Sequence, residues 1–368
     1  MEIREMHLQG WRNYDSAALT FDGSCNVIYG ENAQGKTNLL EAVVYLSCGK
    51  SPRARSDREL MGFDAQEARV TGHILSRERE FVTDVHLYRG RRRKMTVNGV
   101  TAKNGAALSD VLHTVFFAPE DLFLIRAGAA ERRRFMDTSL CQLRPRYGEA
   151  LRQYERLYDH KTRILRDSEE KPELLELLPE FNEGLCRYGA AIVSYRARFC
   201  AALAEHARQA HYECSGQREE LTLTYQTVST VTDPLGSQAD IYGALRDHME
   251  GHQAAERASR LCLSGPHKDD IDVSVNGSSA RQFCSQGQVR TAALSMKLAE
   301  REIHKNAMGE YPVMLLDDVL SELDARRQDF VLNQIRSGQV VITCCELERL
   351  TELGRTILIR NGQLIEQV

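Results

Sequence analysis

The 368-residue chain has no continuous apolar run as long as a membrane-spanning helix needs, about 18 residues or more. Its mean hydropathy is −0.42. The first six residues carry charges where a secretory signal would have its apolar stretch. We therefore expect a cytoplasmic protein with no membrane association.

An excess of basic charge is also absent, because 48 Lys and Arg stand against 52 Asp and Glu, giving a net charge of −4. Nucleic-acid-binding domains are commonly basic, so a polyanion site here has to be a local patch. The ten cysteines contain no C-x-x-C pair, and a secreted disulfide framework normally occupies a much shorter chain. Reduced, mostly buried thiols are expected. The 42% of hydrophobic residues suffice for a sizeable core and exclude wholesale disorder.

No internal repeat or low-complexity segment is present, and hydrophobic periodicity defines the expected elements. Strands are predicted over residues 25–29, 68–75, 81–88, 94–97, 113–117, 221–228, 271–275, 312–316 and 339–343, with a closing hairpin over 356–366. Helices are predicted over residues 37–46, within 147–209 and over 289–305. Asn-Gly pairs after residues 97 and 275 and within the last segment indicate hairpin turns.

This order predicts an α/β fold in which residues 1–118 and 255–368 form one lobe and residues 119–254 form a mainly helical insertion. Within 147–209, Pro172, Pro179 and Gly184 are expected to break the helical pattern into pieces of about twenty residues. Two or three antiparallel helices are therefore predicted, with no long coiled coil.

The strongest motif is a complete G-x-x-x-x-G-K-[ST] sequence at residues 30–37, which we call the phosphate loop. It lies between a predicted strand and a predicted helix. Its glycines let successive N–H groups converge on phosphate oxygens, and the helix adds its positive end. The lysine supplies charge to the β- and γ-phosphates, and the threonine hydroxyl is a Mg²⁺ ligand. The predicted ATP-binding residues are Gly30, Glu31, Asn32, Ala33, Gln34, Gly35, Lys36 and Thr37.

An apolar strand at residues 312–316 ends in two carboxylates, Asp317 and Asp318. Paired with a phosphate loop, this is a Walker B strand: Asp317 is predicted to help hold Mg²⁺, and Asp318 to orient or activate the attacking water. About 280 residues separate the two motifs. Such a separation favours a phosphate-loop domain split by an insertion.

A third element is the Ser-Gln-Gly-Gln sequence at residues 285–288, which we call the signature loop. It lies at the start of a predicted helix, whose N-terminus would be a second place to bind an anion. The alternative is that the loop is an ordinary N-cap. One nucleotide does not need both loops from one subunit. If two subunits sandwich ATP, then Ser285, Gly287 and Gln288 would contact the partner's γ-phosphate.

Together these motifs resemble the ABC-type ATPase heads of the SMC/Rad50 group, and within it the RecF family. The resemblance is carried by GENAQGKTNLLEA (30–42), FAPEDL (117–122), ERRRFMDTSL (131–140), GPHKDD (265–270), SQGQVRTAALSMKLAE (285–300) and LLDDVLSELD (315–324). The resemblance implies a mixed sheet with an antiparallel β subdomain and an inserted helical lobe. It also implies a weak, DNA-stimulated ATPase that uses ATP and Mg²⁺.

The family resemblance further implies an ATP-dependent homodimer that clamps DNA at single-strand/double-strand junctions. With RecO and RecR it would promote recombinase loading and the SOS response in DNA repair and replication. Residues 321–324 match the segment that crosses the dimer interface. Three departures stand out: Lys268 replaces the family's usual Arg, residues 50–54 differ from its Ser-His-Arg-Thr pattern, and residues 343–346 contain no histidine.

Two basic clusters bear on DNA. Residues 89–94 hold five positive charges, of which Arg91, Arg92, Arg93 and Lys94 are the candidate DNA contacts, with a solvated turn as the alternative. Residues 126–146 hold six arginines against Glu131 and Asp137, and pairing within a helix is the alternative there. Either patch should bind in a salt-dependent, largely sequence-blind way.

Two other functions share these motifs. A transporter ATPase subunit has the phosphate loop, signature and Walker B strand, but is usually shorter and keeps a late histidine. A structural SMC-type clamp needs coiled-coil arms that this chain lacks. His267 is a possible metal ligand, but no Cys or His stands at ligand spacing from it.

Overall fold

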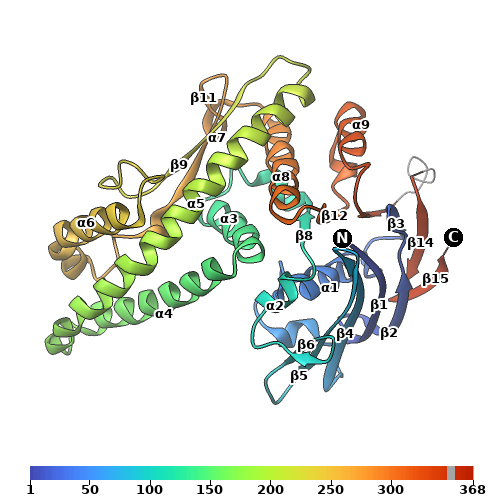
Figure 1. Cartoon of the computed structure of the whole chain (residues 1–368), viewed down its shortest axis with the longest axis horizontal. Coiled ribbons are helices and arrows are strands. Elements are labelled where there is room, and N and C mark those ends of the chain that lie inside the picture. Colours follow the sequence, from blue (N-terminus) through green and yellow to red (C-terminus); the bar gives the residue numbers. More distant parts are fainter. Residues whose placement is uncertain (346–352, 368) are drawn as a thin grey trace. The chain divides into compact units, whose positions relative to one another are not determined.

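The computed structural model describes residues 1–345 and 353–367. Two compact units are present, Met1–Phe123 with Lys297–Val368, and Leu124–Met296 (Figure 1). Sequence analysis placed the junctions at 118/119 and 254/255. The second junction differs because the strand following residue 255 pairs with a strand at the end of the predicted insertion, and so falls in the second unit. Residue 346, part of the segment without histidine, lies outside the described residues.

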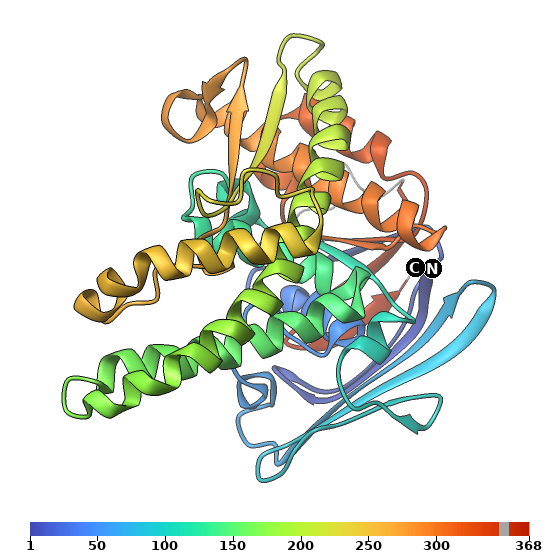
Figure 2. The same cartoon turned by 60° about the vertical axis from the view of Figure 1, so that its left-hand side comes forward.

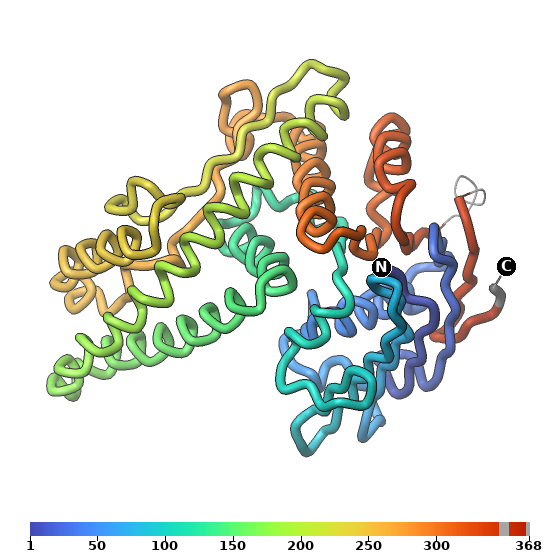
Figure 3. The backbone as a smooth tube through the Cα atoms, in the orientation of Figure 1, coloured from blue at the N-terminus to red at the C-terminus, as the bar shows by residue number. Residues whose placement is uncertain are grey.

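The first unit contains two six-stranded sheets. One is antiparallel, in the order β2-β1-β4-β5-β6-β7. The other has the order β15-β14-β3-β13-β12-β8, with only the β14–β15 pair antiparallel. The antiparallel strands are β1 (Glu2–Trp11), β2 (Tyr14–Thr20), β4 (Glu67–Ser76), β5 (Arg79–Tyr88), β6 (Lys94–Val97) and β7 (Val100–Thr101). The mixed sheet holds β3 (Cys25–Tyr29), β8 (Thr114–Phe117), β12 (Val313–Asp317), β13 (Val340–Cys344), β14 (Arg355–Arg360) and β15 (Gln363–Gln367). In Figure 3 the blue start and the red end of the chain lie side by side, as the pairing of β3 with β14 requires.

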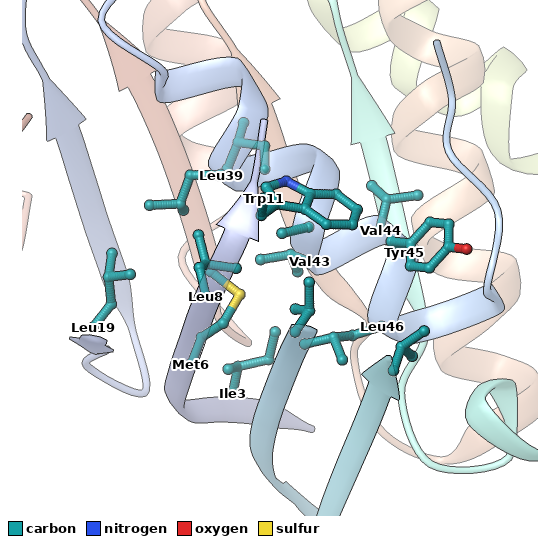
Figure 4. Packing of buried hydrophobic residues seen from close by; sticks show 14 of the residues in the cluster. Ile3, Met6, Leu8, Trp11, Leu19, Leu39, Val43, Val44, Tyr45 and Leu46 are labelled. Carbon is teal, nitrogen blue, oxygen red and sulfur yellow. The ribbon is translucent and has the colours of Figure 1, made fainter. Parts of the chain in front are cut away.

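The core of this unit forms around α1 (Lys36–Cys48). Apolar side chains of β1, including Met6 and Leu8, pack against Leu39 and Val43 of the helix (Figure 4). Trp11 is fully buried, its ring 5.3 Å from that of Tyr45. Buried residues of β3, β12, β13 and β14 belong to the same cluster. The helix that follows the phosphate loop is therefore held by both sheets. Also in this unit are α2 (Ala106–Ser109), α9 (Ala325–Gln334) and the short 3-10 turns η1 (Asp57–Leu60), η2 (Pro119–Phe123) and η5 (Leu320–Glu322).

The second unit packs helices beside a three-stranded sheet of order β11-β10-β9. Its elements are α3 (Ala129–Leu143), α4 (Pro145–Asp167), η3 (Pro172–Leu177), α5 (Leu178–Cys214), β9 (Leu221–Gln226), α6 (Gln238–Ser259), η4 (Pro266–Lys268), β10 (Asp270–Val275), β11 (Ser278–Ser279) and α7 (Ala280–Phe283). The junction at 296/297 falls inside α8 (Gln286–Met308). Among the described residues, no helix is both long and apolar enough to cross a bilayer.

The expected break at Gly184 is wrong, because this residue lies within α5, which is 37 residues long in all. A Cβ at position 184 would lie 2.6 Å from Leu157 Cδ1, so the glycine permits the close approach of α4 and α5 (Figure 2). Pro179 lies in the first turn of α5, where its missing N–H has no helical partner to lose.

The predicted α/β class and the other predicted elements are confirmed, most to within two residues of their expected ends. The Asn-Gly turns at 98–99, 276–277 and 361–362 have positive φ at both positions and close the hairpins β6–β7, β10–β11 and β14–β15. The β1–β2 hairpin at the start of the chain was not predicted.

Candidate nucleotide-binding site

The phosphate loop joins the carboxyl end of β3 to α1, and its glycines are required by backbone geometry. Gly30 and Gly35 have φ of 151° and 115°, in the region that side chains disfavour. A Cβ at Gly30 would lie 2.3 Å from the carbonyl oxygen of Ile359, and one at Gly35 would lie 2.6 Å from Asn13. Ala33 also has positive φ, at 63°.

Hydrogen bonds from outside the motif hold the backbone of this loop. Tyr14 donates its hydroxyl proton to the Gly35 carbonyl at 3.0 Å, and Asn13 Nδ2 donates to the Gln34 carbonyl at 3.0 Å. The backbone N–H of Gly362 also donates to Gln34, at 3.0 Å. The loop is thus fixed by the turn between β1 and β2 and by the last hairpin. Sequence analysis missed Asn13 and Tyr14, which carry no motif of their own.

Lys36 is buried and its ammonium group bends back across the loop. Nζ donates to the carbonyl oxygens of Gly30 at 2.6 Å and Glu31 at 2.8 Å, and lies 3.7 Å from Cys345 Sγ. The charge is therefore held against the loop by two backbone carbonyl oxygens.

Asp317 connects the phosphate loop to the Walker B strand. Its Oδ1 accepts from Thr37 Oγ1 at 3.0 Å and from Thr343 Oγ1 at 2.8 Å. Thr343 is the cross-strand partner of Asp317 in the parallel β12–β13 pair. Burial raises the pKa of Asp317, and the two threonine hydrogen bonds oppose this shift. The two residues predicted to hold Mg²⁺ therefore lie in direct contact, although their positions are 280 apart in the chain.

The donor set fits Mg²⁺. A threonine hydroxyl and a carboxylate offer the hard oxygen atoms that this cation prefers. The buried Asp317 carboxylate has hydroxyl hydrogen bonds and no ion pair among the described residues, so a cation would stabilise its charged form.

Asp318 follows immediately, in an unusual backbone conformation. Its φ is 53°, a left-handed value that costs energy in a residue with a side chain. Its N–H donates to Thr343 Oγ1 at 2.9 Å, and the side chain is half-buried. The side chain of Asp318 is thus less buried than that of Asp317.

A charged cluster that sequence analysis did not identify lies on the first turns of α1. Glu41 is fully buried and accepts from Arg12 Nε and Nη2, both at 2.8 Å. Arg53 Nη2 donates to Glu41 Oε2 and to Asn38 Oδ1, each at 2.8 Å. Although burial raises the pKa of Glu41, hydrogen bonds from Arg12 and Ser51 and the charges of the two arginines lower it overall. Arg53 also lowers the pKa of Asp317 through its charge, so this guanidinium lies near the Walker B carboxylate. An acid among the apolar residues of α1 is the one available sequence signal for the cluster.

The signature loop caps its own helix. Gln288 N–H donates to Ser285 Oγ at 3.2 Å, and Ser285 N–H donates to Gln288 Oε1 at 2.9 Å, which is a capping box. Gln288 Nε2 also donates to Glu219 Oε1 at 2.9 Å. Ser285 and Gln286 are exposed, and Gly287 and Gln288 are half-buried. The N-cap alternative therefore describes the hydrogen bonding of Ser285, and the loop surface stays accessible.

Comparison with known proteins identifies the family. A model of the RecF/RecN/SMC N-terminal domain matches residues 2–363. DNA replication and repair protein RecF of Agathobacter rectalis is 37% identical over 354 residues, covering 96% of this chain and 94% of the relative. RecF of Clostridium kluyveri is 35% identical over 99% of both chains. The chain belongs to the RecF family.

Solved structures support this family assignment. The recombination mediator protein RecF with ATPrS, in the RecFOR pathway, matches with a TM-score of 0.93 and 31% identity over 100% of this chain and 98% of that one. The Smc head domain of Pyrococcus furiosus matches with a TM-score of 0.56 and 15% identity, over 100% and 95%. The ABC-type head fold shared with SMC proteins is thus confirmed.

In this RecF-family chain the first basic cluster divides into bound and accessible side chains. Arg93 Nη1 donates to Tyr45 Oη at 2.7 Å and pairs with Asp57 at 3.1 Å. Arg91 stacks on the ring of Tyr88, 3.7 Å from its centroid. Arg91, Arg92 and Lys94 are exposed. Arg93 is therefore half-buried and hydrogen-bonded within the fold, whereas the other three candidate DNA contacts stay exposed.

Part of the second basic cluster is held within this RecF-family fold. Arg132 is buried and forms a bidentate pair with Asp270, at 2.6 and 2.8 Å. Arg133 donates to the Asp269 carbonyl at 2.7 Å. The GPHKDD segment therefore engages two of the six arginines, while Arg144 and Arg146 are exposed, and a DNA-binding role for the cluster stays a prediction.

The histidine of that segment is also engaged. His267 Nδ1 lies 2.8 Å from Tyr154 Oη and Nε2 lies 3.1 Å from the Cys262 carbonyl oxygen. Burial lowers the pKa of His267 to about 4. Both ring nitrogens have partners, so His267 is a neutral packing residue of the GPHKDD segment.

Proposed function

We propose that this chain is an ATP-dependent DNA-binding protein of recombinational repair and replication-fork maintenance. ATP closes a homodimer on DNA at gaps between single- and double-stranded segments, and slow hydrolysis reopens it. In the cytoplasm it acts with RecO and RecR to promote recombinase loading and the SOS response. The observation that carries the proposal is the direct contact between Thr37 and Asp317, which assembles a phosphate loop and a Walker B strand into one site.

Binding of ATP is the first step of this proposal. Residues 30–37 cradle the phosphates, with backbone N–H groups directed into the loop and Lys36 supplying charge to the β- and γ-phosphates. Thr37 and Asp317 would hold Mg²⁺, which when bound neutralises phosphate charge. Arg53, fixed by Glu41 and Asn38, adds a second positive charge near the same carboxylate. Structures of the related RecF with ATP and with ATPrS support this assignment.

Hydrolysis is assigned to Asp318. Asp318 directly follows the proposed Mg²⁺ ligand, with a left-handed backbone at φ 53° and a half-buried side chain. It can accept a hydrogen bond from the attacking water and orient that water toward the γ-phosphate. We propose a weak ATPase stimulated by DNA.

Dimerisation is assigned to the signature loop. Ser285, Gly287 and the start of α8 present an accessible helix N-terminus, a favourable place for an anion. Because the phosphate loop of the same chain already surrounds its nucleotide, the signature loop is free to contact the γ-phosphate of a partner subunit.

DNA contact is assigned to the accessible part of the first basic cluster, Arg91, Arg92 and Lys94. These side chains would meet phosphates and carry no base specificity. Arg93 is expected to act through the fold, by its bonds to Tyr45 and Asp57.

The test is whether the purified protein binds duplex DNA only when ATP is present. We expect ATP-dependent binding that weakens steeply with salt. A Lys36→Met variant is the matched control and should show no ATP-dependent component. Equal binding without nucleotide by both proteins would contradict the proposal.

A further inference from the structure

Two histidines and a glutamate meet on the outer face of the antiparallel sheet, away from the nucleotide site. Glu5 and His7 lie on β1, and His73 lies on β4 directly opposite Glu5 in the ladder. Met6 and Leu8 point toward α1 (Figure 4), so their neighbours Glu5 and His7 point to solvent.

The geometry of this cluster brings three ligand atoms together. One atom from each side chain lies within 4.8 Å of the other two. His7 Nε2 and Glu5 Oε2 are 3.9 Å apart, and the two imidazole rings are 6.2 Å apart between centroids. Glu5 and His7 are each about half exposed, at 49% and 52%. The cluster therefore lies open to an ion from solvent on a backbone fixed by the β1–β4 pairing.

We propose that Glu5, His7 and His73 form a binding site for Zn²⁺ or a similar borderline divalent cation. Tetrahedral zinc with bonds of about 2.0–2.2 Å places its ligand atoms about 3.4 Å from one another. Small side-chain rotations bring the three atoms to that separation, since none of the side chains is buried. Two imidazoles and one carboxylate suit zinc, cobalt, nickel or copper, with water as the fourth ligand.

The ligand chemistry separates this site from the one proposed for Mg²⁺. Thr37 and Asp317 offer only oxygen atoms, whereas two of the three ligands here are nitrogens, which Mg²⁺ binds poorly. An excess of Mg²⁺ should therefore leave the sheet site available. The proposal does not rest on the proposed function.

Binding should also stabilise the sheet. The metal joins β1 to β4, and β1 carries core residues Met6, Leu8 and Trp11. An ion that binds the folded chain and not the unfolded one raises the unfolding temperature as its concentration rises.

The experiment titrates the metal-free full-length protein with Co²⁺ and with Zn²⁺ in excess Mg²⁺ without nucleotide. We expect one Co²⁺ per chain with visible absorption of a nitrogen- and oxygen-ligated ion, its displacement by Zn²⁺, and a higher unfolding temperature with Zn²⁺. His7→Ala and His73→Ala should each weaken binding at least about tenfold, because losing a direct ligand costs more than losing one of its supporting contacts.

The matched control is His86→Ala. His86 lies on β5 of the same sheet, with ring nitrogens near Glu67 and Tyr88, and does not belong to the cluster. It should bind metal like the original chain. Undiminished binding by the His7→Ala/His73→Ala double variant, thiolate-to-cobalt absorption, or no saturable binding at all would each overturn the proposal. Circular dichroism of each variant checks that the fold is intact.

Discussion

The phosphate loop and the signature loop differ in how their functional side chains are engaged. In the first, residues far apart in the sequence converge: Thr37 contacts Asp317, and Tyr14 and Asn13 hold the loop backbone. In the second, Ser285 and Gln288 bond to each other and the loop stays open to solvent. The phosphate loop is thus joined to the Walker B strand of its own chain, whereas the signature loop caps its helix and contacts Glu219. This difference leads us to propose that the second loop acts on a partner's nucleotide.

Lys36→Met, in the phosphate loop, should have the largest effect of the variants considered. It removes the charge for the β- and γ-phosphates, so nucleotide binding and ATP-induced dimerisation should both be lost. Fluorescent-nucleotide titration and light scattering measure the two. Dimerisation on ATP as strong as that of the original chain would show that the phosphate loop is misassigned.

Asp318→Asn should separate binding from hydrolysis. The proposed Mg²⁺ ligand Asp317 is kept, while the water loses its acceptor, so turnover should fall by about 10²–10⁴-fold with ATP binding intact. The expected species is a long-lived dimer on DNA. Turnover equal to that of the original chain would remove Asp318 from its proposed role.

Glu41→Gln tests whether the charge cluster on α1, next to the phosphate loop, stabilises the folded chain. Arg12 and Arg53 would lose their shared carboxylate, at a cost of about 3 kcal/mol in unfolding free energy at neutral pH.

The pKa of Glu41 is lowered in the folded state. Its contribution is therefore present above the unfolded value of 4.5 and is lost as pH falls through the folded value. Urea unfolding should show the variant and the original chain converging in acid. A pH-independent difference would contradict this account.

Charge reversal of Arg91, Arg92 and Lys94 should have the smallest effect. DNA affinity should fall, and the slope of log affinity against log salt should flatten by up to about 3, with ATP binding unchanged. Arg93→Gln is the contrasting variant, since it should reduce stability through Asp57 and Tyr45 more than DNA affinity. If the triple variant binds DNA with the same affinity and salt dependence as the original chain, the cluster is a solvated turn with no DNA contact.

The parts of the site that sequence predicted are those encoded by local spacing. Gly30, Lys36 and Thr37 stand in one short motif, and Asp317 ends an apolar strand. Thr343 could not be identified in this way, because only the register of β12 and β13 places it beside Asp317. Arg132 looked like surface charge for the same reason: its partner Asp270 is 138 positions away.

The fold shows the same limit. The Asn-Gly hairpins and the strands around them follow from local turn chemistry. The β1–β2 hairpin was missed because its turn residues, Arg12 and Asn13, are not an Asn-Gly pair, although Arg12 has positive φ. Gly184 was taken for a helix break, although its small size serves the contact with Leu157.

The most direct test of the shared site is a mixing experiment with Ser285→Arg and Lys36→Met. Ser285→Arg should keep monomer nucleotide binding, because Lys36, Thr37 and Asp317 are unchanged, but it should lose dimerisation and hydrolysis. Ser285→Ala is the control for the lost helix cap, which costs about 1 kcal/mol.

A mixed dimer of the two variants contains one intact site, formed by the phosphate loop of the Ser285→Arg chain and the signature loop of the Lys36→Met chain. We predict partial recovery of ATPase activity on mixing. Loss of nucleotide binding by the Ser285→Arg monomer, with no recovery on mixing, would place the signature loop in its own subunit's site and contradict the clamp.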